Sequence, residues 1–241
     1  MTRIARVEDP RAERILQTVE LVRSRGDPAR ARLCIMSLVA YMAGEAHGDH
    51  PKAASPVIAA FARPVNDAMD RATRQRLVPF APRIQGTAGA EDGLRQKILH
   101  RKLLDTLLPA VVRDLQVGAQ DHAHANAAEA TARLFTALRE APENEHPRLV
   151  QDPRWDHAAL ISPLRVAIGA HRDGAGVQQA EAIARVLIAA VSCLARPSRR
   201  EWYWAQAVDL LDRMCEVERA QVPAQTLALP EPVTGQLAIS A

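Results

Sequence analysis

Aromatic side chains are scarce in this chain and make up only 3% of its 241 residues. Runs of isoleucine, valine and threonine are also few, and these residues together with the aromatics favour β-strands. Much of the apolar content is instead alanine, which with leucine and arginine favours helices. The composition therefore argues against a sheet-rich fold. It predicts an all-α protein, an irregular bundle of about seven to nine helices.

Cysteine is too sparse to support a disulfide framework. Its three positions, Cys34, Cys193 and Cys215, are odd in number and widely spaced, and no C-x-x-C pair occurs. We expect all three to be reduced core residues of a cytoplasmic protein. A strong excess of one charge is lacking as well. The formal net charge is +3 and acids are interleaved with bases, so the balance permits an acidic partner without requiring one.

No apolar run is long enough to cross a bilayer. The longest, VLIAAVSCLA at 186–195, falls short of the ~18 residues that a spanning helix needs. The N-terminal string MTRIARVEDPRAER contains no apolar segment of the secretory kind. These absences predict a protein with no membrane contact, located in the cytoplasm.

The chain does have a repeated signal for the start of a helix. Asp or Ser directly precedes Pro at 9–10, 27–28, 55–56, 152–153 and 162–163. The acceptor side chain can cap the first turn, and proline fits the first helical position because its missing amide would have no partner there. Apolar stripes then predict helices that begin at 56 and that cover 10–25, 28–43, 94–116, 120–140, 156–172, 175–195 and 198–218.

The expected organisation is one helical domain over residues 1–220, followed by a mobile, proline-containing tail over 221–241. Two polar breaks interrupt the domain, at 79–93 and 141–155. The second break is where the domain would divide if there were two.

The most polar connection, AGEAHGDHPKAASP at 43–56, joins the second and third predicted helices. Three interpretations stay open. His47, Asp49 and His50 are ligand types that suit a divalent metal such as iron(II) or zinc, with a further ligand from elsewhere in the fold. A carboxylate beside an imidazole would instead make a general base, so that catalysis would depend on Glu45, His47, Asp49 and His50. The third interpretation is a loop that only caps and packs helix ends.

Several strings around this loop, GEAHGDHP, SPVIAAFARPVND and PRIQGT, fit the pattern GE-x-x-x-DHP, SPV, ND and PR-x-x-GT. In this respect the chain resembles an uncharacterised family of hypothetical bacterial helical proteins, to which no established activity is attached. The resemblance implies that seven polar residues belong together: Glu45, Asp49, His50, Asn66, Asp67, Arg83 and Thr87. Within such a cluster Arg83 would clamp Glu45 or Asp67. The chain departs from the family at Pro64-Val65, where the pattern has a bulky aromatic residue before Asn66, and this departure bears on the shape of the Asn66–Asp67 turn.

Two further surfaces are candidates for contact with partners. Trp202, Tyr203 and Trp204 are consecutive at the start of the last predicted helix, so they cannot all face the core. Exposed aromatic residues favour interfaces. Basic clusters at 71–76 and 95–102 would suit contacts with phosphates.

These patterns favour a helical binding or accessory protein that acts through protein–protein contacts, either as a homo-oligomer or with another protein. Its binding residues would be Arg83, Asn66, Asp67, Trp202 and Trp204. The alternative is a small-molecule or metal-dependent enzyme with its site in the loop at 44–50, for which a divalent metal is the cofactor suggested. A second alternative is association with nucleic acid.

Overall fold

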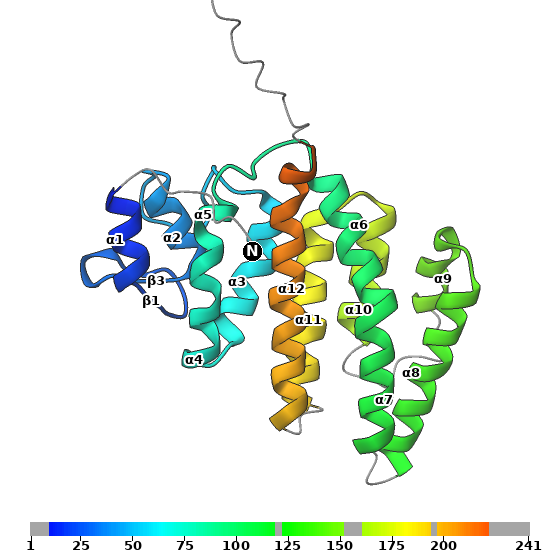
Figure 1. Ribbon diagram of the computed structural model, residues 1–241. Helices are drawn as coiled ribbons and strands as arrows, with labels where there is room; N and C mark the ends of the chain where they lie inside the picture. The colour runs from blue at the N-terminus through cyan, green and yellow to red at the C-terminus, as the bar shows by residue number, and fades with distance from the viewer. Residues whose placement is uncertain (1–9, 119–121, 152–160, 194–196, 222–241) are drawn as a thin grey trace, which may run out of the picture.

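The computed structural model of the protein describes residues 10–118, 122–151, 161–193 and 197–221. Helices dominate this part of the chain, and nine of the described α-helices have eight residues or more. The prediction of an all-α, irregular bundle is therefore confirmed, with the addition of a small three-stranded sheet. Figure 1 shows this sheet at one side of a row of long helices.

The first helix is shorter than its apolar stripe predicts. α1 (Pro10–Thr18) gives way to three two-residue strands: β1 (Glu20–Leu21), β2 (Gly26–Asp27) and β3 (Arg32–Leu33). The strand order is β1-β3-β2. β3 pairs in parallel with β1 and antiparallel with β2.

The helices predicted at 10–25 and 28–43 are therefore wrong in extent. Ser24, Gly26 and Ala31 have φ angles of 56°, 73° and 51°, which belong to the left-handed region. A right-handed helix cannot pass through residues in that conformation. The apolar stripe continues in sequence, but the backbone turns.

Asp27 does start a helix, as predicted, but a very short one. Its carboxylate accepts a hydrogen bond from Ala29 N at 3.0 Å, and the 3-10 turn η1 (Pro28–Arg30) follows. α2 (Ile35–Met42) then begins separately after Cys34, whose sulfur accepts from an amide of the first turn. This helix is central to the core, because its first six residues are all buried.

α3 (Pro56–Ala68) begins at the predicted Ser55-Pro56 pair, where Ser55 Oγ accepts from Ile58 N at 3.2 Å. The helix continues through Pro64 instead of ending there. An internal proline costs one backbone hydrogen bond. Burial of apolar side chains on both sides of Pro64, among them Phe61 and Val65, holds the helix in place.

Short elements occupy most of the region before the next long helix. They are α4 (Arg71–Arg74), the 3-10 helix η2 (Gln75–Phe80) and α5 (Ala81–Ile84). The loop predicted at 79–93 is therefore shorter than expected. It extends only from the end of α5 to the start of α6 (Asp92–Lys102).

α6 continues through a π-helical turn, η3 (Leu103–Leu107), into α7 (Leu108–Gly118). The turn ends two residues before Pro109. In a regular helix proline lacks the amide donor and its ring clashes with a preceding carbonyl. A wider π turn accommodates this irregularity without ending the helix.

The C-terminal half consists of α8 (His122–Glu140), the 3-10 turn η4 (Glu143–Glu145), α9 (His146–Gln151), α10 (Ile161–Arg172), α11 (Gly176–Cys193) and α12 (Pro197–Gln221). The longest of these, α8, α11 and α12, lie close to their predicted positions. The predicted break at 141–155 contains α9, which packs against α8 and α10.

α12 packs against elements from both halves of the chain. It contacts α3, η2 and α6 in the N-terminal half and α11 in the C-terminal half. Figure 1 shows it in the middle of the molecule, between α3 and α5 on one side and α6 on the other. Its buried side chains belong to the same core as those of α3 and α11. They are Tyr203, Trp204, Ala207, Leu210, Leu211, Met214 and Cys215.

Cys34 and Cys215 are buried and are not joined in a disulfide, as predicted, whereas the side chain of Cys193 lies outside the described residues. Burial raises the pKa of the Cys34 thiol. No helix in the described part of the chain is both long and apolar enough to cross a membrane. The predicted tail also lies outside the described residues, apart from Gln221 at the end of α12.

Candidate functional site

The loop between α2 and α3 is organised around Glu45. Its carboxylate accepts hydrogen bonds from the backbone amides of Lys52 and Ala53, each at 2.8 Å. Ala53 O accepts in turn from Gly86 N at 2.8 Å, which joins this loop to the segment after α5. The predicted position of the loop between two helices is confirmed. Glu45 closes the loop through backbone hydrogen bonds.

The two histidines of this loop face outward. His47 is exposed, and so is His50, whose side chain is 74% exposed. His50 Nδ1 lies 2.8 Å from Asp49 Oδ1, while the backbone oxygen of Asp49 accepts from Arg63 at 3.2 Å. Among the described residues no three His, Cys, Asp or Glu side chains come together in a way that could hold a metal ion. The structure therefore does not direct His47, Asp49 and His50 toward one point.

Asn66 and Asp67 lie at the other end of α3. Asn66 is fully buried; its Oδ1 accepts from Ile35 N at 3.2 Å and its Nδ2 donates to Val22 O at 2.9 Å. Asp67 Oδ1 accepts from Ser24 N at 2.9 Å. The two side chains thus connect α3 to the strand region and to the start of α2.

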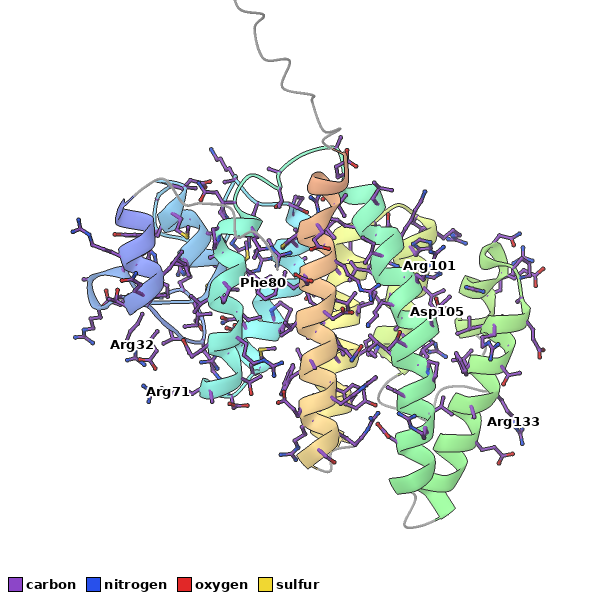
Figure 2. The ribbon with its side chains drawn as sticks, viewed as in Figure 1. Arg32, Arg71, Phe80, Arg101, Asp105 and Arg133 are labelled. Atoms are coloured by element: carbon purple, nitrogen blue, oxygen red, sulfur yellow. The ribbon has the colours of Figure 1, made fainter. Side chains whose placement is uncertain are left out.

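Arg83 on α5 reaches across to α12. It donates to the carboxylate of Asp212 and to the backbone oxygen of the same residue, and it lies 3.7 Å from a carboxylate oxygen of Glu216. Its guanidinium carbon is 5.0 Å from the ring centre of Phe80, which Figure 2 labels. Arg83 thus clamps carboxylates, but these belong to α12 and not to Glu45 or Asp67.

The seven residues that the family resemblance groups together occupy separate places. Thr87 Oγ1 accepts from Ser55 N at 2.9 Å, which puts it near the start of α3, at the same joint as Glu45. Asn66 and Asp67 lie at the far end of this 13-residue helix. The structure therefore brings Glu45 and Thr87 near each other and separates both from the Asn66–Asp67 pair.

A buried network beside this joint was not predicted. Ser55 Oγ donates to Asp92 Oδ1, which also accepts from Arg95 Nη1 at 2.8 Å. Arg95 is fully buried, and its Nε donates to Met214 O at 3.2 Å. The sequence interpretation that put Arg95 on a basic surface stripe is wrong. The signal that could have corrected it is Asp92, three residues earlier on the same helix face.

The aromatic cluster at the start of α12 is mostly internal. Tyr203 is fully buried, Trp204 is 5% exposed, and only Trp202 keeps partial exposure. Burial, and then the hydrogen bond from Tyr203 to the Asp114 carboxylate, raise the pKa of the phenol. The Arg199 guanidinium lies 4.4 Å from the Trp202 ring centre. Trp204 therefore belongs to the core, and the predicted contact patch is reduced to Trp202.

The basic cluster at 71–76 is engaged within the protein. Arg71 pairs with Glu20 at 2.8 Å, and Figure 2 shows it close to Arg32, which pairs with the same carboxylate. Arg74 is buried and donates to two backbone oxygens. Arg76 pairs with a glutamate of α12. These arginines tie elements together and do not line up as one basic face.

Three histidines from different helices meet in the interior. The rings of His100 (α6) and His171 (α10) stack in parallel with centres 3.7 Å apart, and His146 (α9) lies 6.1 Å from His100. Gln179 Nε2 lies 3.5 Å from His100 Nδ1. Burial, together with the neighbouring imidazoles, lowers the pKa of His100 to about 3. Among the described residues this cluster does not form an arrangement that could hold a metal ion.

An accessible groove with a volume of about 650 Å³ lies between α6 with η3 and α12. Figure 1 shows these helices side by side, and Figure 2 labels Arg101 and Asp105 on the first of them. We call it the α6–α12 groove. It is lined by Leu94, Lys97, Ile98, Arg101, Lys102, Asp105, Thr106, Arg213, Glu216 and Val217.

The groove combines apolar and charged walls. Leu94 is 39% exposed, although leucine usually becomes buried, and Ile98 and Val217 lie beside it in the lining. On the α12 side, Asp209 accepts from Lys102 at 2.7 Å and from Arg213 at 3.1 Å. Burial alone would raise the pKa of the Asp209 carboxyl. The hydrogen bonds and positive charges of Lys102 and Arg213 outweigh burial and hold this pKa below its usual value.

Two other cations of the groove have no carboxylate partner among the described residues. Lys97 and Arg101 are exposed and form no ion pair within the described part of the chain. They stand four residues apart and hence on one face of α6. The sequence places both in a basic cluster, but it gives no sign that they border an apolar concavity built with a helix more than a hundred residues away.

Comparison of the chain with family models, with curated proteins and with solved structures finds no match.

Proposed function

We propose that this protein is a binding protein that acts through protein–protein contacts, and that the α6–α12 groove is its contact surface. The observation that carries the proposal is the combination of an exposed apolar residue, Leu94, with two cations, Lys97 and Arg101, that form no ion pair with a described residue and lie at the rim of the same concavity. Interfaces characteristically combine a buried apolar centre with a charged rim.

The position of the groove in the fold supports the proposal. Its walls, α6 and α12, both pack against α3 and α11, so the surface is preformed and binding would not require the helices to rearrange. The π turn η3 lies along one wall, and π turns occur frequently at functional sites. By contrast, the polar residues of the 43–56 loop form local hydrogen bonds that fix the loop itself.

Site-specific photo-cross-linking tests this function. A benzoylphenylalanine at position 94 should form a covalent adduct with the partner in an extract of the source cells. Position 177 on α11 is the matched control, because Val177 is also apolar and is 40% exposed, against 39% for Leu94. Both variants should keep the helical circular dichroism of the unmodified protein.

The expected result is an adduct from position 94 alone, including one of twice the chain mass if the partner is a second copy. Excess unlabelled protein should abolish the adduct, whereas the Leu94→Asp protein should compete at least about tenfold less well, since a buried carboxylate opposes docking. The absence of an adduct from position 94, or the same adducts from position 177, would overturn the proposal.

A further inference from the structure

We infer that the segment which occupies the α6–α12 groove is an acidic amphipathic helix. The inference rests on the proposed function and adds the chemistry of the partner. The groove follows α6 and η3 from Leu94 to Thr106, a distance of about 18 Å at 1.5 Å per residue. Two packed helices leave a groove of this kind, and a third helix of about three turns would fill it in the manner of helix-in-groove recognition.

The apolar residues of the groove require an apolar stripe on the partner. Leu94 and Ile98 are four residues apart and so lie one above the other on α6, with Val217 opposite on α12. A helix with apolar residues at i, i+3 or i+4, and i+7 presents a stripe of matching length. An extended strand would alternate its side chains between two faces and would leave half of its apolar residues in water.

The charges of the groove determine which helix fits. Four cationic and two anionic side chains line it, so the surface favours a negative partner. Lys102 and Arg213 already share one carboxylate, that of Asp209. Lys97 and Arg101 are not neutralised by a described residue, and they are one helical turn apart on the same rim.

Two carboxylates one turn apart on the partner would pair with both cations at once. Two carboxylates also line the groove and would repel acids placed beside them: Glu216 on the opposite rim, and Asp105 one turn beyond Arg101. The partner is therefore expected to have an apolar stripe with acids on one flank, and not acids all round.

A pair of designed peptides tests the inference. Each has 15 residues, a leucine stripe at helical spacing and one charged flank, with Glu at every flank position in the first and Lys in the second. A third peptide has the composition of the first in scrambled order. Fluorescence anisotropy of labelled peptide against the full chain gives the affinities at low and moderate salt.

The expected order is tight binding of the Glu peptide, at least tenfold weaker binding of the Lys peptide and no saturable binding of the scrambled one. The double variant Lys97→Glu with Arg101→Glu should reverse the preference between the Glu and Lys peptides. A control with the same change in net charge, Arg133→Glu with Arg172→Glu, should keep the original preference. Both control positions are exposed and outside the groove.

Equal affinity for the Glu and Lys peptides, an unchanged preference in the Lys97–Arg101 variant, or no binding of either peptide would overturn the inference. The proposed function would then still stand if position 94 gave its specific cross-link. A cross-link formed equally by the native and charge-reversed proteins would likewise retain the groove as the contact surface and exclude an acidic partner.

Discussion

At the scale of single residues, burial changes the chemistry of His100 most clearly. The stacked ring of His171, the nearby His146 and the amide of Gln179 surround it, and none of these groups provides a negative charge that would stabilise an imidazolium. The folded protein therefore holds His100 neutral, with its pKa lowered to about 3. In the unfolded chain a histidine takes up a proton below about pH 6.5.

This difference makes stability depend on pH. Between about pH 6.5 and pH 3 the unfolded chain binds a proton at His100 that the folded protein excludes, so the free energy of unfolding falls as the pH falls. From pH 7 to pH 5 we expect a loss of about 2 kcal/mol from this group. Urea unfolding at each pH measures it.

The variant His100→Asn should lose this part of the pH dependence, because asparagine does not titrate. His47→Asn is the matched control: it removes a histidine that is exposed on the 43–56 loop, and its stability should follow the native curve. If His100→Asn and the native protein lose stability in parallel between pH 7 and pH 5, the interpretation of the cluster is wrong.

For single residues, the sequence predicted helix N-caps more accurately than it predicted which side chains are buried. Ser55 and Asp27 accept first-turn amides where the Ser-Pro and Asp-Pro pairs indicate, because a cap depends only on neighbours in the chain. Arg95 could not be recognised as a buried residue, since its burial depends on Met214, more than a hundred residues away. Because Arg95 is followed by other lysines and arginines in the sequence, the pattern predicted that it lies on the surface.

At the scale of elements, the Asn66 side chain connects α3 with α2 and with the segment after β1 through hydrogen bonds. From α3 it binds the first amide of α2 and a carbonyl just after β1, and it is fully buried. Its removal leaves Ile35 N and Val22 O without their partner in the interior. Buried groups left without a hydrogen bond cost about 1–3 kcal/mol each.

We therefore expect Asn66→Ala to lower the free energy of unfolding by about 3 kcal/mol. The control is the adjacent change Asp67→Asn, which keeps an oxygen acceptor for Ser24 N on an exposed side chain and should change stability by less than about 0.5 kcal/mol. Chemical denaturation with circular dichroism measures both variants. Equal stability of Asn66→Ala and Asp67→Asn would contradict the role assigned to the Asn66 side chain.

Element types and the long C-terminal helices were predictable because apolar periodicity is a local property. The strands between α1 and α2 were not, since each has only two residues and depends on a left-handed turn at Ala31 that no sequence rule requires of alanine. The loop at 43–56 was placed correctly, but its chemistry was not determined. Glu45 binds amides seven and eight residues away, and only the folded loop shows this.

At the scale of the whole molecule, α12 connects parts of the chain that are far apart in sequence. Its ion pairs and hydrogen bonds reach Arg76 in η2, Arg83 in α5, Lys102 in α6 and Asp114 in α7. The same helix buries its apolar face in the common core. A chain connected in this way should unfold as one unit over the residues expected to form a single domain.

Differential scanning calorimetry should therefore show one transition, with the calorimetric and van't Hoff enthalpies equal. Asp212→Ala removes the acceptor of Arg83 and should shift this transition down by about 2–4 °C without splitting it, as expected for a loss of about 1 kcal/mol. Glu129→Ala, at an exposed pair on α8, should shift it by less. Two resolved transitions would contradict a single unit and would favour a division at the 141–155 break.

The central position of α12 also bears on how the chain acquires its fold during synthesis. Phe61 and Leu187 share a core with Tyr203 and Leu210, which the ribosome adds after all other described helices. Until those residues emerge, the apolar faces of α3 and α11 lack the helix that covers them. The common core should therefore be completed only after α12 has been synthesised, so that compaction comes late.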